Sequence, residues 1–177
     1  MPQSSQLIPS YREAGKGMEL AGAGDRFQRD LEVIVEQIPL FRDFARNEVG
    51  ILAGFLLTYD VAKGATLFHE GAKGDSLYVV LKGQIDLFKE AGPRNYKKIH
   101  TVRDGKTMGE MSLLDGLPYS ASAVATEPSR VLLMTKMKFA RLTEEQPPLA
   151  LKLVTSVAKL LSLRLRQTTG ILLDHIE

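Results

Sequence analysis

The sequence predicts a mainly β domain with flanking helices, and three observations support this fold class. Between Leu56 and about Met134, short apolar and β-branched runs alternate with glycine-containing turns. Turns at such regular spacing indicate many short strands in a sandwich, barrel or roll. Apolar residues recur at helical spacing before this region and again over the last part of the chain. A chain of 177 residues is long enough for one domain with a sizeable core.

The composition narrows the class of protein. Apolar residues make up 44% and charged residues 25% of the chain, as in soluble globular proteins. The net charge of +2 gives no electrostatic reason to expect nucleic acid or an acidic membrane as partner. The absence of cysteine excludes disulfides and thiolate metal sites. No apolar run is long enough to cross a bilayer, and the amino terminus lacks a secretory core, so we expect a cytoplasmic protein.

The chain begins with a stretch rich in Gly, Ala and Ser. We interpret residues 1–24 as a flexible tail and residues 25–177 as a single domain. Asp25 and Gln28 resemble a capping box that begins a helix, which Pro39 ends. A second helix is expected from about residue 43 to residue 55.

The β-roll is predicted over about residues 56–135. Ile85 and Leu87 alternate with Asp86, which is typical of a strand with one buried face. A single glycine separates neighbouring strands at each of several turns: Lys63-Gly64, Gly71, Lys73-Gly74, Lys82-Gly83, Ala91-Gly92, Asp104-Gly105 and Asp115-Gly116.

Helices return at about residues 136–177. The segment Leu149 to Leu165 is amphipathic and carries two apolar stripes. A helix with so broad an apolar face packs on its own domain and on a second surface. We therefore predict a homodimer through this helix, with burial against its own core alone as the alternative.

The segment Met108–Ala121 carries the chemistry. Gly109 permits a close backbone approach, and a short helical turn follows it. Free amides at the start of such a turn favour an anion, while Glu110 can accept a hydrogen bond from a sugar hydroxyl. Ser120 can donate to a phosphate oxygen. The alternative is a plain turn between strands with Glu110 in solvent.

This segment resembles the phosphate-binding cassette of the cyclic-nucleotide-binding domain family. Lys63–Gly83 resembles the family's glycine-punctuated strands, and Glu36–Phe41 resembles its entry helix. The resemblance covers about Val33 to Arg166. It implies a double-stranded β-helix, or jelly-roll, of eight strands with N-terminal helices and a long C-terminal helix.

The resemblance also implies site residues. Gly109 and the amides of Met111 and Ser112 would hold the cyclic phosphate. Glu110 would bind the ribose 2′-hydroxyl, and Ser120 would contact the phosphate or the purine. The implied ligand is cyclic AMP or cyclic GMP, with no cofactor required.

Tyr119 occupies the position of the family's phosphate-binding arginine. Arginine offers a fixed charge and a fork of donors, and loss of one partner of a buried charge pair costs roughly 3–5 kcal/mol. A tyrosine hydroxyl restores only about 1 kcal/mol. We therefore expect weakened or altered binding.

Two further positions are weaker candidates. Alignment of the last helix places Arg164 where it could cap the purine, with a solvated arginine as the alternative. His100 precedes the cassette near the expected base, with a surface histidine as the alternative.

Other classes of protein are less well supported. The chain has three histidines, His69, His100 and His175, which are widely separated, and its sequence has no metal-binding or nucleophile motif. We therefore do not expect this protein to be an enzyme. About a dozen residues follow Arg166, without a recognition helix, so we expect no direct DNA binding and an output through a separate effector protein. The remaining alternative is a degenerate dimerisation or interaction module.

Overall fold

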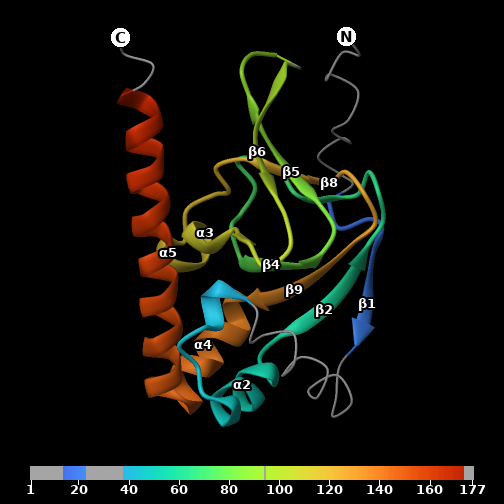
Figure 1. Ribbon diagram of the computed structural model, residues 1–177. Coiled ribbons are helices and arrows are strands. Elements are labelled where there is room, and N and C mark those ends of the chain that lie inside the picture. Colours follow the sequence, from blue (N-terminus) through green and yellow to red (C-terminus); the bar gives the residue numbers. More distant parts are fainter. Residues whose placement is uncertain (1–13, 23–37, 94, 174–177) are drawn as a thin grey trace.

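The computed structural model describes residues 14–22, 38–93 and 95–173. Within them, two antiparallel sheets pack face to face, with helices at one end and along one side (Figure 1). In spatial order, the first sheet contains β1 (Met18–Gly22), β2 (Leu57–Val61), β9 (Ser129–Thr135), β4 (Ser76–Lys82) and β7 (Thr107–Met108). The second sheet contains β3 (Thr66–Phe68), β8 (Ser122–Ala125), β5 (Ile85–Glu90) and β6 (Tyr96–Val102). The predicted mainly β class is confirmed.

The space between the sheets is filled by apolar side chains from both. Val80 of β4 pairs with Val131 of β9, and both are fully buried. Ile85 of β5 and Ala123 of β8 meet them from the second sheet. The strands β2 to β7 are short, and a glycine follows each of them within three residues, so the chain turns back repeatedly and the sheets close into a compact roll around this core.

The helices form a second core at one end of the roll. They are a 3₁₀ turn (Pro39–Phe41), α2 (Arg46–Ala53), α3 (Glu110–Asp115), α4 (Lys136–Glu145) and α5 (Pro147–Leu173). Leu40, Leu52, Leu142 and Leu153 are almost completely buried together. The helix α2 is shorter than the expected 43–55, because Ala45 has an extended backbone and the helix begins after it.

The amino-terminal region differs in part from the expected tail. Met18–Gly22 forms the edge strand β1, in which Met18 pairs with Val61 and Leu20 with Tyr59. The partner strand lies far along the chain, so local composition did not indicate this pairing. It brings the described strands to nine, one more than the expected eight. The helix expected from Asp25 to Ile38 lies almost wholly outside the described residues.

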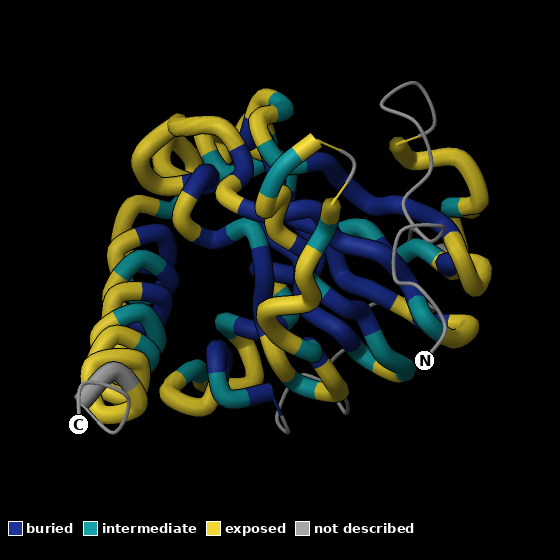
Figure 2. The backbone as a smooth tube through the Cα atoms, turned by 90° about the horizontal axis from the view of Figure 1, so that it is seen from above, coloured by how far each residue is buried: buried dark blue, intermediate teal, exposed yellow. Residues whose placement is uncertain are grey.

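The first half of α5 is docked on the molecule. Leu149, Leu153 and Val157 are buried, while Lys152 binds Glu48 at 2.5 Å and Lys159 binds Asp43 at 2.9 Å. From Ser162 to Ile171 the residues are exposed, apart from the half-buried Arg164. Figure 2 shows this exposed end of the helix close to the carboxyl terminus. Within the described part of the chain, no helix combines the length and apolar character needed to span a bilayer.

The two ion pairs of α5 give a pH-dependent stability. Hydrogen bonds from Lys159 and Lys152 hold the pKa of Asp43 and of Glu48 below their ordinary values. Folded-state pKa values that are lowered stabilise the protein above the unfolded pKa, about 4, and this stabilisation is lost as the pH falls through the folded pKa. We expect the D43N/E48Q variant to be less stable than wild type at pH 7 and equal to it near pH 2, as measured by urea unfolding.

The matched control is E144Q, which changes an exposed carboxyl group on α4. Its effect should be small at both pH values. A D43N/E48Q deficit that persists unchanged at the lower pH would contradict the ion-pair explanation.

Candidate functional site

The cassette, residues 108–121, begins at a backbone position that only glycine suits. Gly109 has φ +76° and forms the N-cap of α3. A Cβ atom at this position would lie 2.5 Å from the carbonyl oxygen of Ser76. The left-handed backbone and the close approach to Ser76 together explain why this position is a glycine.

A second glycine holds the cassette from the other side. Gly74 lies before β4, and a Cβ atom there would be 2.1 Å from Cβ of Ser112 and 2.5 Å from the carbonyl oxygen of Leu117. The turn and α3 are therefore in direct backbone-to-side-chain contact. This contact fixes where α3 lies on the roll.

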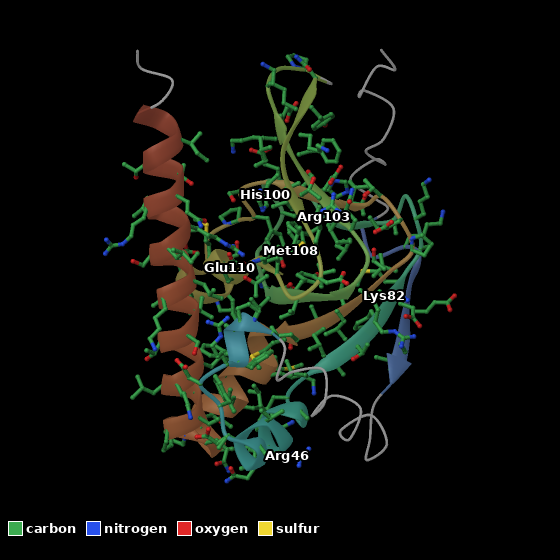
Figure 3. The ribbon with its side chains drawn as sticks, viewed as in Figure 1. Arg46, Lys82, His100, Arg103, Met108 and Glu110 are labelled. Carbon is green, nitrogen blue, oxygen red and sulfur yellow. The ribbon has the colours of Figure 1, made fainter. Side chains whose placement is uncertain are left out.

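Glu110 points into the protein rather than into solvent. Its side chain is only 5% exposed, and Oε1 accepts a hydrogen bond from Nη1 of Arg164. Nη2 of Arg164 donates to the carbonyl oxygen of Thr107 at 2.8 Å and to its Oγ1 at 2.9 Å. The other carboxylate oxygen, Oε2, is buried without a hydrogen-bond partner among the described residues. Figure 3 shows Glu110 between the roll and α5.

A buried carboxylate oxygen without a donor is costly and therefore informative. Buried polar atoms are nearly always hydrogen-bonded, and an unsatisfied one costs about 1–3 kcal/mol. An incoming hydroxyl group would satisfy Oε2 of Glu110. Arg164, which was expected near a purine, instead neutralises this carboxylate.

Tyr119 is turned into the core. Its ring stacks on Phe68 at a centroid distance of 4.0 Å, and only 5% of the residue is exposed. Its hydroxyl accepts hydrogen bonds from the amides of Ser76 at 3.1 Å and Asp75 at 3.4 Å. Burial raises the pKa of Tyr119, so the hydroxyl is neutral at physiological pH.

The remaining predicted residues are more dispersed. Met111 is half-exposed and Ser112 is buried against the Gly74 turn. Ser120 is exposed, and its carbonyl oxygen accepts a hydrogen bond from Lys89 at 2.9 Å. His100 is exposed on β6 opposite Leu87. Of the predicted residues, Glu110 and Arg164 are in direct contact, and Gly109 precedes Glu110 at the start of α3.

Sequence reasoning missed several residues of the site. Thr107, Asp75 and Ser76 were not singled out, although they hold Arg164 and Tyr119 in place. The signal for Asp75 and Ser76 was their position directly after the Lys73-Gly74 turn. Nothing in the local sequence indicated the contact between Thr107 and Arg164, which are 57 residues apart.

The comparisons with known proteins identify the family. The family model of the cyclic nucleotide-binding domain matches residues 59–146. A crystal structure of a cyclic nucleotide-binding domain from Methylobacillus flagellatus is 30% identical, with a TM-score of 0.77 over 89% of this chain and 88% of that one. This chain therefore belongs to the cyclic nucleotide-binding domain family, and the jelly-roll fold is confirmed.

Two curated relatives are named as a cyclic AMP receptor protein and as the regulatory subunit of a cAMP-dependent protein kinase. The cyclic AMP receptor protein of Thermus thermophilus is 33% identical over 73% of this chain and 58% of its own length. The cAMP-dependent protein kinase regulatory subunit of Aspergillus fumigatus is 32% identical over 65% of this chain and 27% of its own length. The chain thus spans only part of the curated relatives that it matches.

The Tyr119 hydroxyl is predicted to stabilise the turn before β4. In a Y119F variant the buried Ser76 amide loses its acceptor, and we expect a loss of about 1–3 kcal/mol in the free energy of unfolding. Y59F is the control, because Tyr59 is only partly buried. Equal stability of Y119F and Y59F in urea unfolding would contradict this role.

The close contact at Gly74 gives a second prediction. A G74A substitution forces α3 away from the turn and should destabilise the protein by about 1–3 kcal/mol. G170A, in an open stretch of α5, is the control and should be neutral or slightly stabilising. Native stability in G74A, measured by urea unfolding, would show that the turn yields easily.

Proposed function

We propose that this chain is a regulatory domain that binds a cyclic nucleotide, cyclic AMP or cyclic GMP, through its cassette, and that it senses the ligand rather than catalysing a reaction. One observation carries this proposal: Glu110 is buried in the cassette, and its Oε2 has no donor in the part of the chain that the structure describes. A ribose 2′-hydroxyl supplies the missing donor. The family membership and the names of the relatives support the same ligand class.

The part of the cassette that would face the cyclic phosphate, Gly109 with the start of α3, supports weakened or altered binding of the nucleotide. Gly109 provides no capping side chain for the first amides of α3, which favours an acceptor of ligand origin. The residue opposite, Tyr119, is neutral and buried, and its hydroxyl already binds Ser76. A cyclic phosphate therefore lacks the guanidinium that the family cassette normally offers.

The second candidate function is an interaction module that binds no nucleotide. The packing of Tyr119 against Phe68 favours it, because this arrangement fills the core instead of facing a ligand. In both cases we propose that α5 mediates homodimerisation, since Leu163 and Leu165 are more than half exposed on its outer half. An output through a separate effector protein and a cytoplasmic location stay predictions.

Ligand titration separates the two functions. A ligand that binds the folded state raises the melting temperature, so millimolar cyclic AMP or cyclic GMP should raise it for the wild-type protein. A Y119R variant should bind at least tenfold more tightly than Y119Q, because both lose the aromatic ring but only Y119R brings a charge to the phosphate.

Calorimetric titration of both variants provides the affinities. If neither nucleotide raises the melting temperature of the wild type or of Y119R, the interaction module is the correct function. Equal affinities of Y119R and Y119Q would show that an arginine at position 119 does not reach the phosphate.

A further inference from the structure

We infer that Arg164 of α5 supplies the positive charge for the cyclic phosphate that the cassette of this chain lacks. The inference rests on the proposed function and names the residue that makes an anionic ligand acceptable to the site. It starts from the charge balance: Glu110 is negative, Tyr119 is neutral, and a cyclic phosphate adds another negative charge. A cation beside the carboxylate offsets the repulsion between these two negative groups.

Arg164 has hydrogen-bond donors that its contacts with Glu110 and Thr107 do not use. A guanidinium group carries five N–H donors, and the three bonds of Arg164 use both hydrogens of Nη2 and one of Nη1. Nε and the second hydrogen of Nη1 have no partner among the described residues. The side chain is 39% exposed, so solvent reaches part of it.

The pair presents adjacent groups of opposite character. Oε2 of Glu110 needs a hydroxyl donor, and Arg164 beside it has N–H groups that need an acceptor. In a 3′,5′-cyclic nucleotide the free 2′-hydroxyl is next to the carbon that carries the phosphate ester. One ligand can therefore satisfy both groups without breaking the ion pair.

Lys89 is a second cation close to a predicted site residue, and it is less suitable. Nζ of Lys89 donates to Oε1 of Glu70 at 2.8 Å and to the carbonyl oxygen of Ser120 at 2.9 Å. It therefore has at most one donor left, and it shares no partner with Glu110. Arg164 is the cation that the geometry favours.

The test compares cyclic AMP with adenosine, which has the same ribose hydroxyl and base but no phosphate. We measure the ratio of the two dissociation constants for the wild type, R164Q, R164K and the control R166Q, which removes an exposed arginine two residues away. The preference for cyclic AMP should fall at least tenfold in R164Q and stay within about twofold in R166Q. R164K should keep an intermediate preference, because it keeps the charge but not the fork.

The ratio of dissociation constants separates a specific effect from a general loss of folding, since damage to the whole site weakens the binding of both ligands together. In the wild type, added salt should weaken cyclic AMP more than adenosine. An unchanged ratio in R164Q would overturn the role of Arg164 while leaving the proposed function intact. Failure of the wild type to bind either cyclic AMP or cyclic GMP would overturn both.

Discussion

Glu110 brings a negative charge into the interior, and Arg164 is the cation that makes this burial tolerable. Removal of one partner from a buried ion pair costs about 3–5 kcal/mol, because the other charge is left without compensation. The pair also joins two parts of the chain that are 54 residues apart, the cassette helix α3 and the outer half of α5. The geometry of the site and the position of this half of α5 are therefore coupled.

The rest of the fold supplies the rigid surroundings of this pair. Gly109 and Gly74 allow α3 to pack against β4 and its preceding turn at distances that a Cβ atom would not permit. Ion pairs of Lys152 and Lys159 hold the first half of α5 on the protein. The outer half is exposed, and its Arg164 contacts the roll at Thr107. Opening of this helix half would separate Arg164 from Glu110. A ligand at Glu110 could therefore shift the population of docked and free positions of the helix.

Much of the fold could be predicted because its signals are local. Glycine turns at regular intervals predicted the short strands, and the amphipathic pattern from Leu149 to Leu165 predicted the long helix α5, on which Leu153 and Val157 are buried. Gly109 and Glu110 stood out because the cassette is a contiguous segment with a known family pattern. The contacts that could not be predicted are those set by long-range packing.

Three particulars illustrate that limit. The strand β1 depends on pairing with β2, about 40 residues later, and its own composition is typical of a tail. Tyr119 lies at a position where its ring can face either the ligand or the core, and its stacking on Phe68 decides the direction. Arg164 has a long side chain whose partner depends on the exact height of α5 beside the roll, which no sequence pattern specifies.

The central claim is that Oε2 of Glu110 awaits a ribose hydroxyl, and calorimetric titration of the wild-type protein with cyclic AMP and 2′-deoxy cyclic AMP tests it most directly. The account predicts that the deoxy compound binds at least tenfold more weakly, because the buried carboxylate oxygen then stays without a donor. Equal affinity for the two compounds, or no binding of either, would contradict it.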